Sequence, residues 1–178
     1  YAIMQLISET YDLMQRGLGL NNDELHQVFK QWNEGEMQSF LIEITADIFK
    51  QPDDKTGNRL VDMILDKAGS KGTGKWTSKD AMNLPAPIPV IDMAVTIRNI
   101  SSFKEERLAA AELYKPAIKP ITAKREVVIK QVHDALYFAT IICYAQGLAM
   151  LHSASAELDM QIPLADVVKI WRGGCIIR

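Results

Sequence analysis

The sequence predicts an all-α fold: a multi-helix domain with long central apolar helices. Apolar side chains recur at steps of three and four along most of the chain, which is the period of an amphipathic helix. No segment shows strands alternating with helices. Residues 123–158 form one uninterrupted helical pattern. We therefore expect residues 1–178 to form a single helical domain.

A helix is predicted from the first residues of the chain, ending at the Gly17-Leu18-Gly19 sequence. Its apolar face is formed by Met4, Leu6, Ile7, Tyr11 and Met14. A second helix is predicted to begin with Asn22 as its N-cap, because acidic residues follow in the first turn, where they suit the helix dipole. The apolar stripe of this helix contains Leu25, Val28, Phe29 and Trp32, and a third helix is predicted over 37–49.

A polar loop over 51–58 separates these helices from the middle of the chain. Residues 60–66 fit a strand or a helix equally well. A short helix capped by Thr77 or Ser78 is predicted to end near Leu84.

Pro89 can open the next helix, which is predicted to reach Tyr114 with a break at Ser101-Ser102. A linker is expected over 115–120. The long helix over 123–158 follows, and a last helix is predicted from Pro163 to Cys175.

Composition excludes several classes of protein. Lys plus Arg total 20 and Asp plus Glu total 22, and the net charge of -2 gives no general attraction to nucleic acid or to an anionic membrane. The two cysteines, Cys143 and Cys175, cannot form a disulfide framework, so a reducing cytoplasm is expected. The most apolar stretch, 135–151, is shorter than the roughly 20 residues of a membrane span, and we expect it to be a buried central helix.

Both ends of the sequence fall within predicted helical or apolar segments. The chain starts with Tyr1 rather than Met, inside an amphipathic pattern, and its last residues form an apolar run. From this we expect a piece of a longer protein.

The glycine-rich stretch over 69–77 has the composition of an anion-binding loop. Glycine backbone N–H groups can approach a phosphate closely, and lysine and threonine add charge and donors. A flexible surface loop explains the same residues equally well. The P-loop pattern fails at Trp76, where Ser or Thr is needed, and the dinucleotide fingerprint fails at Thr77, where glycine is needed.

Other chemically interesting residues have ordinary explanations. His26, His133 and His152 lack the spacing of a metal pair, so we predict partner-bonded or exposed histidines and no metal site. Cys143 lies in the apolar helix and is expected to be an inert core residue. Arg98 lies among apolar neighbours, where a structural salt bridge is favoured over a ligand contact on the local sequence alone.

Several of these segments together resemble 6-phosphogluconate dehydrogenase, the decarboxylating enzyme of the pentose phosphate pathway. The most specific match is LDKAGSKGTGKWT over 65–77, which resembles the substrate loop of that family. WRGGCIIR over 171–178 is equally specific. Three further segments match the family: Tyr1 together with residues 4–9, residues 40–45, and residues 144–147. The resemblance covers all 178 residues in order and spacing.

The resemblance implies a definite function. Members of the family oxidise 6-phosphogluconate with NADP bound on an N-terminal Rossmann domain, release CO2 and form ribulose 5-phosphate. Their large all-α domain forms most of a homodimer in the cytoplasm. Mapped onto this sequence, the substrate-binding residues are Tyr1, Lys71, Thr73 and Arg98. The resemblance thus makes Lys71 and Arg98 expected phosphate ligands, in place of the structural salt bridge that the local sequence favours for Arg98.

The resemblance also implies what this stretch of chain lacks. The catalytic glutamate of the family immediately precedes the tyrosine and its lysine lies slightly earlier, so no catalytic residue is expected within residues 1–178. Ala2 and Ile3 depart from the family pattern of a small residue and Asp. We therefore expect this chain alone to be inactive. A non-catalytic helical dimerisation module is the alternative function, and a P-loop NTPase is disfavoured.

Overall fold

The computed structural model describes residues 1–69, 71–115, 117 and 119–178, and within these ranges the chain is helical with no strand. Only an isolated antiparallel bridge joins Pro52 to Arg59 in the described chain. The prediction of an all-α fold is confirmed. Of the predicted linker over 115–120 and the glycine-rich stretch, Pro116, Ile118 and Ser70 lie outside the described residues.

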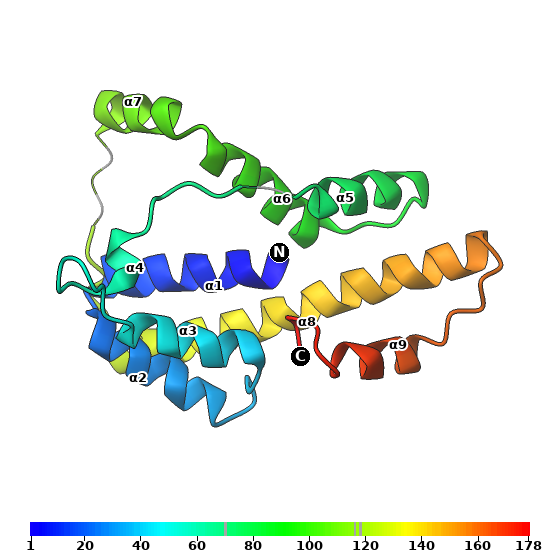
Figure 1. Ribbon diagram of the computed structural model, residues 1–178, viewed down its shortest axis with the longest axis horizontal. Helices are drawn as coiled ribbons and strands as arrows, with labels where there is room; N and C mark the ends of the chain where they lie inside the picture. Colours follow the sequence, from blue (N-terminus) through cyan, green and yellow to red (C-terminus); the bar gives the residue numbers. More distant parts are fainter. Residues whose placement is uncertain (70, 116, 118) are drawn as a thin grey trace. The chain divides into compact units, whose positions relative to one another are not determined.

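Figure 1 shows the order of the elements. They are α1 (Ala2–Asp12), a π-helical turn (Leu13–Gly17), α2 (Asn22–Asn33), α3 (Phe40–Lys50), α4 (Leu60–Met63), α5 (Thr73–Asn83), α6 (Pro89–Ser102), α7 (Lys104–Tyr114), α8 (Arg125–Glu157) and α9 (Leu164–Trp171).

The chain divides into two compact units. Unit 1 contains Tyr1–Leu6, Asp66–Ala117 and Phe138–Val168, and unit 2 contains Ile7–Leu65, Ile118–Tyr137 and Lys169–Arg178. The assignment of residues 1–178 to one domain remains a prediction.

Unit 2 is built around the packed pair α2 and α3 (Figure 1). The Phe29 ring is fully buried, with its centroid 5.0 Å from that of Trp32 and 5.7 Å from that of Phe49. His26 is buried, and its Nδ1 lies 2.8 Å from the carbonyl oxygen of Ala46, so this ring joins the two helices as a partner-bonded histidine.

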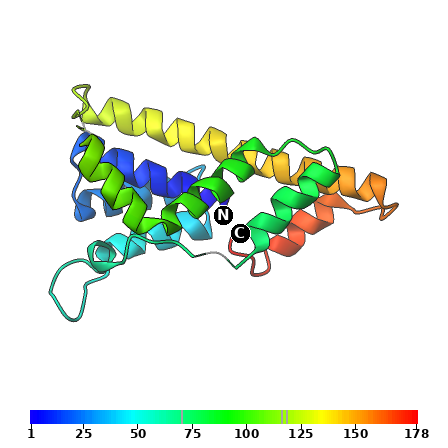
Figure 2. The same ribbon diagram turned by 90° about the horizontal axis from the view of Figure 1, so that it is seen from above.

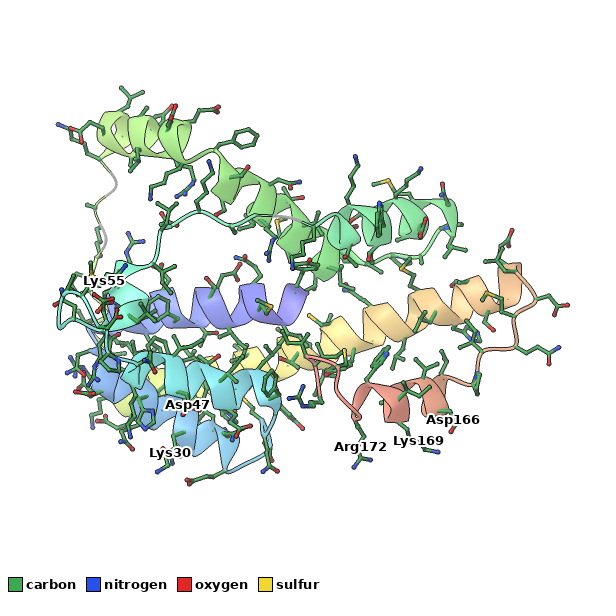
Figure 3. All side chains as sticks on the ribbon, viewed as in Figure 1. Lys30, Asp47, Lys55, Asp166, Lys169 and Arg172 are labelled. Atoms are coloured by element: carbon green, nitrogen blue, oxygen red, sulfur yellow. The ribbon has the colours of Figure 1, made fainter. Side chains whose placement is uncertain are left out.

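The outer faces of α2 and α3 carry charged residues. Lys30 on α2 and Asp47 on α3 are exposed (Figure 3), as a solvated polar face requires. The N-cap of α2 is Asn21 rather than the predicted Asn22, because the Asn21 side chain and Glu24 form a reciprocal capping box. Asn22 instead donates from Nδ2 to Asp62 Oδ2 at 2.7 Å.

Unit 1 has a small core in which Ala2, Ala94 and Cys143 are buried. Partly buried aliphatic side chains pack against them: Ile3, Leu6, Val90 and Ile91. The backbone N–H of Val90 donates to Gln146 Oε1 at 3.0 Å and so attaches the first turn of α6 to α8. Helices α5 and α6 pack against each other, as both ribbon views show (Figure 2). Pro89 opens α6, as predicted, and the break before α7 falls at Phe103.

Long helix α8 departs from one expectation. This helix is longer than the apolar stretch 135–151 that it contains, and only 11% of its most apolar 18-residue stretch is buried in this chain. Phe138 is 65% exposed and Ile141 48% exposed. The expected burial of this helix is therefore wrong for the chain by itself. By length and composition alone, α8 could also cross a membrane.

Candidate functional site

The glycine-rich stretch forms a loop that turns directly into α5. Gly72 is the N-cap residue, with φ 94° and ψ -21°, a left-handed conformation that side-chain-bearing residues adopt at a cost. The N–H of Trp76 donates to the Gly72 carbonyl oxygen at 3.0 Å. The helix therefore begins at Thr73, and the predicted cap at Thr77 or Ser78 is wrong because glycine made an earlier start possible.

Gly74 lets this first turn of α5 come close to α6. A Cβ atom at Gly74 would lie 2.9 Å from Val95 Cγ2 and 3.8 Å from Cδ2 of the Tyr1 ring. Such a short carbon–carbon distance leaves no room for a side chain. The start of α5, the middle of α6 and Tyr1 thus meet at one point.

Arg98 on α6 connects the loop to Tyr1. Its Nε–H donates to the carbonyl oxygen of Gly69 at 2.7 Å. Its guanidinium carbon lies 4.5 Å from the centroid of the Tyr1 ring, a cation–π distance. In the described part of the chain its contacts are thus a backbone carbonyl and an aromatic face, and not the carboxylate of a structural salt bridge.

Lys71 lies on the loop that Arg98 holds, and Thr73 directly follows this loop. Both are exposed, Lys71 between Gly69 and Gly72 and Thr73 at the first position of α5. Among the residues described, neither side chain bonds to Arg98. The structure therefore brings Tyr1, Arg98 and the loop backbone together, and the assignment of Tyr1, Lys71, Thr73 and Arg98 as substrate ligands remains a prediction.

A second group of residues holds the segment before the loop, and no local sequence pattern predicts it. Arg107 on α7 donates from Nη1 to Asp66 Oδ2 at 3.0 Å and from Nη2 to the Asp66 carbonyl oxygen at 2.8 Å. The Arg107 guanidinium, and to a smaller extent the Lys104 ammonium, lower the pKa of the Asp66 carboxyl below its usual value. These partners lie too far from Asp66 along the chain for a local pattern to pair them.

The remaining candidates behave as structural residues. Burial raises the pKa of the Cys143 thiol, so this cysteine is a poor nucleophile and a core residue, as expected. Within the described ranges, no group of three His, Cys, Asp or Glu side chains could hold a metal ion.

Comparison with known proteins identifies the family. Residues 1–178 match the family described as "6-phosphogluconate dehydrogenase, C-terminal domain". The chain belongs to this family. Against the NADP(+)-dependent decarboxylating 6-phosphogluconate dehydrogenase of Bacillus subtilis, identity is 51% over 179 residues, covering 100% of this chain and 38% of that relative. Against the decarboxylating 6-phosphogluconate dehydrogenase of Escherichia coli, identity is 48% over the same coverage.

A solved 6-phosphogluconate dehydrogenase has the same fold. The structure from Plasmodium falciparum, described in its apo form and in complex with NADP+ and with 6-phosphogluconate, superposes with a TM-score of 0.96. It is 46% identical, and the match covers 100% of this chain and 38% of the Plasmodium chain. The chain thus spans about 38% of the length of the relatives it matches.

Proposed function

We propose that this chain is the helical substrate-binding part of a 6-phosphogluconate dehydrogenase. The complete protein would oxidise 6-phosphogluconate with NADP, release CO2 and yield ribulose 5-phosphate. Family membership over the whole chain supports this function. The observation that carries it is the placement of Arg98 between the glycine-rich loop and Tyr1.

This arrangement suits a phosphomonoester. Such a group carries nearly two negative charges at neutral pH, and the Lys71 ammonium and Arg98 guanidinium match that charge. The Nε–H of Arg98 is directed at Gly69, while the two Nη groups of a guanidinium carry four further donors in a planar fork. The hydroxyl groups of Thr73 and Tyr1 would donate the remaining hydrogen bonds.

NADP does not fit the residues of this chain. A dinucleotide site needs a glycine fingerprint between a strand and a helix, but no strand precedes α5 in the part of the chain that the structure describes. In the proposed protein NADP would bind the family's N-terminal domain. The role of residues 1–178 would be to hold the sugar phosphate, and we expect this chain alone to show no dehydrogenase activity.

The test is calorimetric titration of the protein that carries this chain with 6-phosphogluconate and with gluconate, which lacks the phosphate. We expect saturable binding of 6-phosphogluconate that Lys71→Ala and Arg98→Ala each weaken by about tenfold or more, the effect of losing one charge-assisted contact. Lys79→Ala is the matched control, because Lys79 is an exposed lysine on α5, the helix that directly follows the loop of Lys71. Binding that is indifferent to Lys71→Ala and Arg98→Ala would refute the proposed site.

A homodimer is the proposed assembly. The exposed side chains of Phe138 and Ile141 on α8 form an apolar surface, and a second copy of the chain would remove it from water. We expect light scattering at micromolar concentration to give the dimer mass and Phe138→Asp to give the monomer. A monomeric wild-type protein would contradict this assembly.

The alternative, a dimerisation module without a substrate site, predicts the dimer but no binding of 6-phosphogluconate.

The two free thiols, Cys143 and Cys175, support a reducing cytoplasm as the proposed location.

A further inference from the structure

The segment that leads into the glycine-rich loop is tied to the junction of α6 and α7. Four residues make the tie, and we refer to them as the Asp66 clamp: Asp66, Ser101, Lys104 and Arg107. None of them belongs to the proposed phosphate ligands.

Arg107 is the centre of the clamp. It binds Asp66 at both its carboxylate and its backbone carbonyl, and its Nη2 also donates to the carbonyl oxygen of Ser101 at 3.1 Å. Lys104 Nζ lies 3.4 Å from the Asp66 carbonyl oxygen and 3.7 Å from Oδ2. The guanidinium therefore links the segment before the loop to the last turn of α6, where a cation also suits the helix dipole.

Two further hydrogen bonds continue from the clamp toward Lys71. The N–H of Ala68 donates to Ser101 Oγ at 3.1 Å, and the carbonyl of Gly69 accepts from Arg98 at 2.7 Å. The backbone is thus held at Asp66, Ala68 and Gly69 before it reaches Lys71. On the far side, Gly72 caps α5.

Simple stabilisation does not account for the clamp. The Asp66 side chain is 70% exposed and that of Arg107 29% exposed, and ion pairs this accessible contribute little to folding. A fixed backbone, by contrast, lowers the entropy lost when a loop lysine binds an anion.

We propose that Asp66 and Arg107 are positioning residues, which hold the glycine-rich loop so that Lys71 meets the phosphate of the substrate. The inference rests on the proposed function, because it concerns the same phosphate. It assigns residues that make no contact with substrate themselves and act through the loop.

The first experiment compares Asp66→Asn with Asp23→Asn in the complete enzyme. Asp23 is a close match, since its side chain is 73% exposed and pairs with Arg59, which is 35% exposed and also donates to a backbone carbonyl. We expect Asp66→Asn to raise KM for 6-phosphogluconate about five- to tenfold with kcat unchanged. The phosphate takes no part in the reaction, so a weaker contact with it should weaken the ground state and the transition state equally. Asp23→Asn should leave both constants unchanged.

The second experiment shows whether the effect passes through Lys71. In the Lys71→Ala background, Asp66→Asn should change KM by less than about twofold, because the lysine that it positions is gone. An equal rise in both backgrounds would overturn the proposal, since it would mean that Asp66 acts independently of Lys71. Ser101→Ala provides a milder variant that removes only the acceptor of the Ala68 N–H, and it should show the same dependence on Lys71.

The outcomes separate this inference from the function on which it rests. If Lys71→Ala and Arg98→Ala raise KM while Asp66→Asn does not, the positioning role is wrong and the proposed phosphate site stands. If Lys71→Ala and Arg98→Ala leave substrate binding unchanged, the proposed site is wrong and the positioning role with it.

Discussion

Gly74→Ala tests the packing that brings the glycine-rich loop to Arg98. The new Cβ would lie 2.9 Å from Val95 Cγ2, a distance that real side chains do not tolerate. Val95 cannot easily turn away, because its β-branched side chain is stiff at χ1 and its Cγ1 lies only 3.8 Å from the same point. The helices must therefore separate slightly, or Val95 must adopt a strained rotamer.

Two opposing terms set the size of the effect. Overpacking a close contact costs about 1–3 kcal/mol. Replacing glycine with alanine in a helix returns at most about 1 kcal/mol, and less here because Gly74 lies in the first turn of α5. We expect a net loss of about 1–2 kcal/mol in the free energy of unfolding. A shift of α5 away from α6 would also move the glycine-rich loop relative to Arg98, so affinity for 6-phosphogluconate should fall.

Urea unfolding followed by circular dichroism measures the first effect, and calorimetry with 6-phosphogluconate measures the second. Gly35→Ala is the control, because its Cβ would meet only the Trp32 carbonyl oxygen at an ordinary 3.8 Å. That variant should be as stable as the wild type or up to about 1 kcal/mol more stable. A Gly74→Ala protein as stable as Gly35→Ala would refute the close contact of α5 with α6.

Three further predictions follow from local features. Gly72→Ala should cost about 1–2 kcal/mol of unfolding free energy in urea titrations, because φ at this position is +94°. Iodoacetamide should modify Cys175 faster than Cys143 in the native protein, measured by mass spectrometry, because Cys143 is buried and its pKa is raised by that burial. Hydrogen bonding from Arg107 lowers the pKa of the Asp66 carboxyl in the folded protein. The ionised carboxylate therefore stabilises the fold at pH values above its pKa in the unfolded chain, about 4, and this stabilisation is lost as the pH falls through the lower pKa of the folded protein. Asp66→Asn should therefore reduce stability in urea only slightly at neutral pH, because the pair is largely exposed, and this small difference from the wild type should shrink below about pH 4.

Helix type and order could be predicted from the sequence because both follow from local periodicity and from residues with strong positional preferences. Pro89 opens α6 as expected, and the break before α7 fell within two residues of its predicted place. Boundaries failed where a single side chain decided them. Ser39 accepts from the N–H of Ile42 and starts α3 at Phe40, later than the apolar pattern alone suggested. The π-helical turn over Leu13–Gly17 has no sequence signal of this kind.

The candidate site was only partly predictable, for a different reason. The loop over 69–77 is a local motif, so its composition and its family resemblance could both be seen. The local pattern does not show which distant residues pair. It favoured a carboxylate partner for Arg98, which in the structure meets Gly69 and Tyr1, and only the family resemblance placed Arg98 and Tyr1 in one site. The prediction that α8 is buried was wrong for this chain, because only a small part of its apolar stretch is covered. An apolar sequence predicts that a surface will be buried but does not say whether the same chain or another one covers it.

The arrangement around the loop explains why a glycine-rich segment can form a precise site. Glycine loses more conformational freedom on ordering than any other residue. A glycine-rich loop would therefore bind a phosphate weakly if it were free on both sides. Here the loop is held before Lys71 by Asp66, Ala68 and Gly69, and after it by the start of α5. In the proposed site, the glycines would allow close approach to the anion, while side chains of α6 and α7 hold the backbone that glycine alone leaves free. On this proposal, residues outside the glycine-rich motif, such as Arg107, would also determine the affinity for the phosphate.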